Sequence, residues 1–299
     1  MTLMRLAAAV ALAVWTSAIA IAQPLVVGAK DFTEQRLISE MTTQLLRANR
    51  FAVYTGSGFT TAGVRSALEA GVVDLYWEYT GTSLSAFHGV REKLPPNEAY
   101  ARVKQLDAEK GLVWLWPSKV NNTYALAMRR GDAEKRAIES ISDLAAKVRH
   151  GERFTLATNG EFLVRPDGLG PLQQAYEFAF DPGAVATMPT SAVYEALRGS
   201  SINVGVVFAT DGRVPAFELT LLRDDRNFFP SYILAPVIGR ATLERHPAIG
   251  ALLKPLAEQL DDRTIADLNA MVDVHHRTVE DVASEFLRDH GLLSQGSPR

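Results

Sequence analysis

The sequence contains no cysteine, and this absence excludes several kinds of site at once. Disulfides, thiolate-bound zinc, iron–sulfur clusters and cysteine nucleophiles all require that residue. Lipid attachment through an N-terminal cysteine is excluded for the same reason, so we do not expect a lipoprotein. Any function must therefore depend on other side chains.

The chain also lacks a large net charge. It has 31 Lys and Arg residues against 34 Asp and Glu residues, which gives a formal net charge of −3 at pH 7. Nucleic acids and anionic membrane surfaces usually attract proteins with a marked excess of positive charge. We therefore expect no nucleic-acid partner and a ligand that is recognised locally.

Motifs of the common catalytic and metal sites are missing as well. The six histidines never stand at the i, i+4 spacing that places two metal ligands on one helix face. There is no Gly-x-Ser-x-Gly elbow, no phosphate loop and no Gly-x-Gly-x-x-Gly. Asp74 and Glu78 could be imagined as an acid/base pair, but strand ends before turns recruit acidic residues for structural hydrogen bonds, and we favour that role. We expect no catalytic residue, no metal ligand and no cofactor.

One long apolar stretch is present, and it lies at the start of the chain. Residues 1–22 carry a single basic residue, Arg5, and end in Ala20-Ile21-Ala22. This pattern is typical of a secretory signal peptide with a small-x-small cleavage site. The alternative is an uncleaved membrane anchor. We expect cleavage after Ala22 and a periplasmic protein.

The remaining chain has the composition and patterning of a folded α/β protein. Hydrophobic residues make up 47% of the 299 residues, and a single core rarely grows beyond roughly 250–300 residues, so two lobes are favoured. Strand-like and helix-like segments alternate, which predicts mostly parallel sheets. We expect strands at 25–28, 72–76, 112–116, 124–128, 154–157 and 202–208, and helices at about 60–71, 142–148, 171–178, 191–197 and from 242 onward.

The first helix should follow Asp31. Leu37, Met41 and Leu45 form an apolar stripe at helical spacing. Asp31 and Glu34 resemble an N-cap with its reciprocal acidic partner. Beyond this helix, Gly56-Ser57-Gly58 predicts a turn.

Aromatic residues gather beside single polar residues at two places. The segment 76–79 holds three aromatic residues in four positions, and the segment 228–232 repeats the theme. Core packing explains most aromatic residues near strands. Ring faces that line a cleft would instead attract a cation that cannot donate hydrogen bonds, at roughly 0.5–2 kcal/mol per ring. The residues alone leave both interpretations open.

Six segments in order resemble the substrate-binding proteins of ABC importers for glycine betaine, choline and carnitine. They are VGAKDFTEQ at 27–35, DLYWEYTGT at 74–82, NNTYAL at 121–126, FLVRPDGL at 162–169, FATDGR at 208–213 and DDRNFFPSY at 224–232. The resemblance implies a two-lobed periplasmic binding protein fold of type II, with the lobes joined by two crossing strands. One lobe would combine residues 23–121 with 229–299, and the other would span 122–228.

The same resemblance implies a site in the cleft between the lobes. An aromatic box would surround a trimethylammonium group, with the Asn122 backbone as an acceptor edge. Three polar side chains would bind the carboxylate of the ligand. The box residues are Tyr79, Tyr124, Phe208 and Tyr232, and the carboxylate contacts are Lys30, Thr82 and Arg165.

Two residues depart from the family pattern, and one has a structural alternative. Phe208 stands where relatives often carry tyrosine, and Trp77 stands where proline is common. We expect Trp77 to cover the lobe surface rather than to form a wall of the cleft. Arg165 precedes a turn signature and could instead pair with Asp167.

The implied function is that of a periplasmic solute-binding protein, not of an enzyme. It would capture glycine betaine or a related quaternary ammonium osmoprotectant as a monomer and deliver it to an inner-membrane ABC permease with its ATPase. A choline or carnitine binder remains an alternative, and so does a sensing module that reports to a membrane receptor. With choline, Lys30 and Arg165 would be positive charges without a carboxylate to bind.

Overall fold

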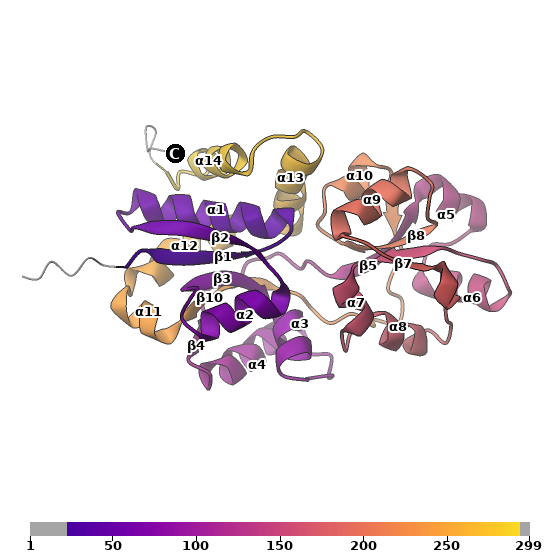
Figure 1. The fold of residues 1–299 in the computed structure, drawn as a ribbon, viewed down its shortest axis with the longest axis horizontal. Helices are drawn as coiled ribbons and strands as arrows, with labels where there is room; N and C mark the ends of the chain where they lie inside the picture. Colours follow the sequence, from indigo (N-terminus) through magenta and orange to yellow (C-terminus); the bar gives the residue numbers. More distant parts are fainter. Residues whose placement is uncertain (1–22, 294–299) are drawn as a thin grey trace, which may run out of the picture.

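The computed structural model describes residues 23–293, which form two five-stranded sheets with helices packed around each (Figure 1). The expected signal peptide lies outside the described residues. Within the described part, no helix combines the length and apolar character that crossing a membrane would require.

The first sheet contains the N-terminal strands and one strand from late in the chain. Its order is β2-β1-β3-β10-β4, with β1 at Leu25–Lys30, β2 at Val53–Phe59, β3 at Leu75–Tyr79, β4 at Leu112–Trp114 and β10 at Leu234–Gly239. β1 runs parallel to both β2 and β3, whereas β10 is antiparallel to β3 and β4.

The second sheet repeats this mixed pattern. Its order is β7-β6-β8-β5-β9, with β5 at Tyr124–Arg129, β6 at Leu156–Thr158, β7 at Val185–Thr187, β8 at Val204–Phe208 and β9 at Leu219–Leu221. β6 pairs in parallel with β7 and β8, and β5 pairs antiparallel with β8 and β9. In each sheet four strands therefore run in one direction, as the prediction of mostly parallel sheets requires, and one strand, β10 or β5, runs against its neighbours. That strand follows a crossing between the sheets, which the local patterns did not predict.

Helices cover each sheet, and we call each sheet with its helices a lobe (Figure 1). The first lobe contains α1 (Thr33–Ala48), α2 (Thr61–Glu69), α3 (Thr80–Thr82) with a π-helical turn (Ser83–Phe87), α4 (Pro96–Ala108), α11 (Arg240–Arg245), α12 (Ala248–Gln259), α13 (Asp262–Asp273) and α14 (Val279–Asp289). The second contains α5 (Arg130–Arg136), α6 (Ile141–Arg149), α7 (Gly160–Val164), α8 (Leu169–Ala175), a 3₁₀ turn (Pro182–Ala184), α9 (Thr190–Arg198) and α10 (Arg213–Ala216). Four helices, α11 to α14, form the tail as expected, with short non-helical connections between them, and the last helix ends at Asp289.

The apolar stripe of α1 is buried as its spacing predicts. Leu37 and Met41 are fully buried and Leu45 is 4% exposed. The helix packs against its own sheet on one side and against α13 and α14 on another. The helix is therefore enclosed on two sides by other elements of the first lobe.

The start of α1 and the segment around residue 57 differ from expectation. The N-cap of α1 is Phe32, with no side-chain cap, while Asp31 accepts a hydrogen bond from Arg36. Glu34 instead points into the lobe interface, where other donors reach its carboxylate. Residues 56–58 continue β2 rather than turning, and the break comes at Thr60, whose hydroxyl accepts the Gly63 amide at 3.0 Å to cap α2.

Two segments cross side by side between the lobes. An antiparallel bridge joins Asn121 to Ile233, and the amide of Tyr232 donates to the Asn121 side chain at 2.7 Å. These crossings come directly before β5 and β10. The ends of several strands therefore meet between the lobes, and they bring distant parts of the sequence together.

Candidate functional site

A cavity of about 290 Å³ lies between the two lobes. Such a volume is near the lower end of small-molecule sites. All eight residues that the sequence analysis selected line it: Lys30, Tyr79, Thr82, Asn122, Tyr124, Arg165, Phe208 and Tyr232. The structure thus brings the predicted residues together, and their role in binding stays a prediction.

The aromatic rings of the cavity form a connected group. Tyr124 lies centrally, with its ring centroid 5.1 Å from that of Phe208 and 6.0 Å from that of Tyr232. Phe32 continues the group, 5.2 Å from Phe208 and 6.4 Å from Tyr79. Phe32 therefore adds a fifth ring to the four predicted for the aromatic box, and below the name covers all five. Such an arrangement of ring faces suits a cation without N–H groups.

Phe32 is a residue that the sequence analysis missed. It stands inside the segment 27–35, two positions after Lys30, and the sequence analysis gives it no role. Its extended backbone at the N-cap of α1 turns the ring into the cavity rather than into the helix core. The available signal was an aromatic residue next to a proposed ligand contact.

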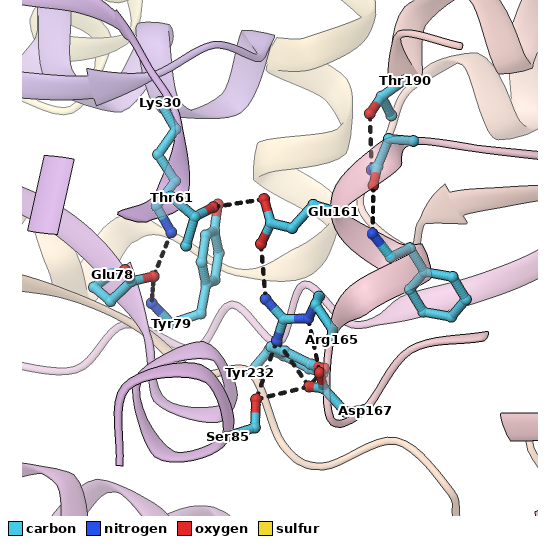
Figure 2. A network of polar contacts seen from close by, with 12 residues as sticks. Lys30, Thr61, Glu78, Tyr79, Ser85, Glu161, Arg165, Asp167, Thr190 and Tyr232 are labelled. Carbon is cyan, nitrogen blue, oxygen red and sulfur yellow. Dashed lines mark hydrogen bonds and ion pairs between the residues drawn. The ribbon is translucent and has the colours of Figure 1, made fainter. Parts of the chain in front are cut away.

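Lys30, at the end of β1, already has a carboxylate partner. Its Nζ lies 2.5 Å from Oε1 of Glu78, and both side chains are buried (Figure 2). The other Glu78 oxygen accepts the hydroxyl of Tyr76 at 3.0 Å, and the amide of Tyr79 donates to Oε1 at 2.7 Å. The Lys30 ammonium also lies 5.0 Å from the ring centroid of Tyr79.

Arg165, at the end of α7, is paired as well. Its Nε and Nη2 bind the two carboxylate oxygens of Asp167 at 2.7 and 2.8 Å, and its Nη1 binds Glu161 at 2.9 Å (Figure 2). The guanidinium holds the pKa of Asp167 below its usual value despite burial of that carboxyl, which acts in the opposite direction. Ser85 and Tyr232 also donate to Asp167.

These pairs overturn one expectation from the sequence. We expected Lys30 and Arg165 to lack a partner unless the ligand brought a carboxylate. Glu78 neutralises Lys30, and Asp167 with Glu161 surrounds Arg165, so both charges are compensated by the protein. The alternative of an Arg165–Asp167 pair is confirmed. Both cations nevertheless remain in the cavity wall, where a ligand can meet them.

Asn122 and Thr82 occupy different parts of the wall. The Asn122 side chain donates from Nδ2 to Glu34 at 3.0 Å, and the role of its backbone as an acceptor edge of the box stays a prediction. Its amide oxygen is buried and has no hydrogen-bond donor. Thr82 lies on α3, directly after the strand that carries Tyr79, and is 4% exposed.

Trp77, Asp74 and Glu78 all have structural contacts outside the proposed ligand contacts. Trp77 is completely buried and donates from Nε1 to Thr42 at 2.9 Å, so it neither covers the lobe surface nor lines the cavity. Asp74 accepts the Val26 amide at 2.9 Å and the Thr242 hydroxyl at 2.7 Å, which is the structural role we favoured. Glu78 belongs to the Lys30 pair. The described residues contain no cluster of three or more His, Asp or Glu side chains arranged to hold a metal ion.

Polar contacts connect the two lobes around the cavity. Glu161 accepts the Thr61 hydroxyl at 2.9 Å (Figure 2), and Thr210 donates to Glu34 at 2.6 Å. Arg213 lies 3.3 Å from Asp273 of α13. The structure therefore shows the lobes in contact over the cavity, an arrangement that would enclose a bound solute.

Comparisons with known proteins agree in family and fold. Residues 23–289 match the model for the substrate binding domain of ABC-type glycine betaine transport systems. The chain is 41% identical to the glycine-betaine-binding protein of Pseudomonas aeruginosa, over 94% of this chain and 93% of that one. It is 32% identical to the glycine betaine-binding protein YehZ of Escherichia coli, over 90% and 92% of the two chains.

Solved structures show the same architecture. The apo structure of YehZ from Escherichia coli superposes with a TM-score of 0.67 at 32% identity and covers 91% of this chain and 100% of that one. A glycine betaine/carnitine/choline ABC transporter structure gives a TM-score of 0.74 at 25% identity, with 90% and 100% covered. The predicted two-lobed type II periplasmic binding protein fold is confirmed.

Proposed function

The chain belongs to the family of substrate-binding domains of ABC-type glycine betaine transport systems, and on that premise we propose that it captures glycine betaine in the cavity between its lobes. The observation that carries the proposal is the aromatic box, whose five rings come from both lobes and from a crossing segment. A trimethylammonium group offers no hydrogen-bond donor, and ring faces are the protein surface that attracts such a cation.

The carboxylate of glycine betaine would lie near the polar side of the cavity. Lys30, Thr82 and Arg165 line that side. Because Glu78 and Asp167 already bind the two cations, the ligand's carboxylate would join existing ion pairs rather than neutralise free charges. We expect this to weaken the preference for a ligand that carries a carboxylate.

Choline is the second candidate, and the same ion pairs favour it. A ligand without a carboxylate leaves no unpaired cation behind when the protein's own acids bind Lys30 and Arg165. An unpaired buried charge would cost several kcal/mol. The objection to choline that the sequence suggested is therefore reduced.

Substrate-binding proteins of this family work with an ABC permease and its ATPase, and we assign the same partners to this chain. We further propose a periplasmic monomer, cleavage of the signal peptide after Ala22, and no catalytic activity. Lobes of residues 23–121 plus 229–299 and of 122–228 are also a proposal, and the membership of the two sheets supports it. Ligand sensing through a membrane receptor remains an alternative, and it would depend on the same closing of the two lobes over the ligand.

Calorimetric titration of the mature chain tests the ligand. Glycine betaine, choline and carnitine carry a trimethylammonium group, whereas proline does not. We expect binding of glycine betaine and weak or absent binding of proline. Choline bound more tightly than glycine betaine would establish the second candidate. Equal binding of proline and glycine betaine would contradict a site built around the aromatic box.

A further inference from the structure

Glu34 is a buried acid beside the aromatic box that has no cationic partner. Its side chain is on α1, and the residue is 2% exposed. Oε1 accepts the Tyr79 hydroxyl at 2.6 Å and the Asn122 amide at 3.0 Å, and Oε2 accepts the Thr210 hydroxyl at 2.6 Å. Among residues 23–293, no Lys, Arg or His nitrogen forms an ion pair with this carboxylate.

The other buried acids at the cavity are already matched by cations. Glu78 pairs with Lys30 and Asp167 pairs with Arg165. Glu161 shares Arg165, but its side chain is 38% exposed, so water and salt screen its extra negative charge. Both cations also lie near rings of the aromatic box. A quaternary ammonium group that entered the box would therefore add a positive charge that these pairs do not balance.

We propose that Glu34 provides the negative charge that balances the ligand's quaternary ammonium group and acts through the ring of Tyr79. This inference rests on the proposed function. The Tyr79 hydroxyl donates its proton to Glu34, which makes the phenol ring richer in electrons and its face more attractive to a cation. The amide of Gln35 donates to the same Tyr79 oxygen at 3.1 Å and fixes the direction of the hydroxyl proton. Glu34 is thus a positioning and charge-balancing residue, one step removed from the ligand.

The proposal predicts a pH dependence with a definite sign. Burial raises the pKa of Glu34, and the hydrogen bonds from Thr210, Tyr79 and Asn122 oppose that shift. Only the ionised carboxylate balances the ligand, so affinity should rise with pH as Glu34 loses its proton, and the bound cation should lower its pKa. The charged groups around Glu34 and its contacts form pairs of their own: Lys30 with Glu78, Arg36 with Asp31, and Arg213 with Asp211 and Asp273.

The decisive experiment compares a cation with its carbon isostere. Glycine betaine and 3,3-dimethylbutanoate have the same shape and carboxylate, but a carbon atom replaces the charged nitrogen in the second. Glu34→Gln removes the charge and keeps a side chain that can accept from Tyr79. We expect this variant to lose at least about tenfold in glycine betaine affinity, the order of effect for one unit charge roughly 10 Å away at an effective dielectric constant of about 20. Its affinity for 3,3-dimethylbutanoate should be unchanged or higher.

Thr210→Val is the matched control. It removes a hydrogen bond to the same carboxylate and a contact between the lobes, but it retains the charge. It should change the affinities for both ligands by the same factor. The rise of glycine betaine affinity with pH should persist in Thr210→Val and disappear in Glu34→Gln.

Several outcomes would overturn the inference. Equal losses for both ligands in Glu34→Gln would mean that Glu34 only supports the structure. An unchanged pH profile in that variant would exclude its charge as the cause, even if the isostere bound too weakly to measure. Wild-type protein that does not bind glycine betaine at all would instead refute the proposed function.

Discussion

Replacing Arg165 by alanine should destabilise the protein without any ligand present, because its guanidinium is the partner of a buried carboxylate. The Arg165 side chain is 3% exposed and makes two hydrogen bonds to Asp167, at 2.7 and 2.8 Å. A third bond, at 2.9 Å, reaches Glu161. Removing one partner of a buried pair costs about 3–5 kcal/mol, since the other charge is left uncompensated.

Differential scanning calorimetry of the apo protein measures this loss. In a chain of this size, 1 kcal/mol corresponds to a shift of about 2–4 °C in Tm. We therefore expect Arg165→Ala to lower Tm by about 10 °C at pH 7. The double variant with Asp167→Asn should recover most of that loss, because it removes the unpaired carboxylate.

The pH dependence provides a second check with a fixed sign. Arg165 lowers the pKa of Asp167 in the folded protein. The pair therefore stabilises the protein above the unfolded pKa of about 3.9, and this contribution is lost as the pH falls through the lower folded pKa. The Tm values of wild type and Arg165→Ala should begin to converge below about pH 4 and meet once the pH is below the folded pKa of Asp167. The reasoning would be refuted if Arg165→Ala had the same Tm as the wild type at pH 7. It would also be refuted if the double variant had a Tm no higher than that of Arg165→Ala.

Three further predictions concern the box and the closing of the lobes. Tyr124→Ala should weaken glycine betaine binding by about 1–2 kcal/mol because a ring face is lost, whereas Tyr124→Phe should keep most of the affinity. If calorimetric titration of Tyr124→Ala gave the wild-type affinity, Tyr124 would be a packing residue and not part of the binding site. A Cβ at Gly212 would lie 2.5 Å from the Ala270 amide and 2.6 Å from the Ala266 carbonyl on α13 of the other lobe. Gly212→Ala should therefore hinder closure and lower glycine betaine affinity more than about tenfold with little change in apo Tm, and unaltered affinity would argue against the lobe contact seen here. Finally, small-angle scattering of the wild type should show contraction on saturation with glycine betaine, and identical curves with and without it would count against a site between closing lobes.

The sequence alone was sufficient for the elements that depend on local patterns. The buried stripe of α1 follows from helical spacing, and the strand at 124–128 and the helical tail follow from short-range periodicity. The ordered motifs also pointed to eight residues that the fold brings to one cavity. Those motifs carried family information that no single residue type contains.

Local patterns failed where the partner of a residue lies far away in the chain. Asp31 and Glu34 look like a capping pair, but the lobe interface offers Glu34 better donors, among them Thr210, which is 176 positions away. The residues around Trp77 do not indicate that its side chain is buried. Its hydrogen-bond partner, Thr42, lies on a helix that packs over the strand. The sheets are mixed because the chain returns between lobes, which is a property of topology and not of any one segment.

Only the tertiary structure decided the electrostatics of the site. Lys30 and Glu78 are 48 positions apart, and nothing in either segment indicates that their charges meet at 2.5 Å in a buried wall. The interaction of two charges depends on their separation and on the water between them, and folding sets both. The sequence therefore determined which residues surround the cavity, whereas the fold determined that its two cations are already paired and that Glu34 is not.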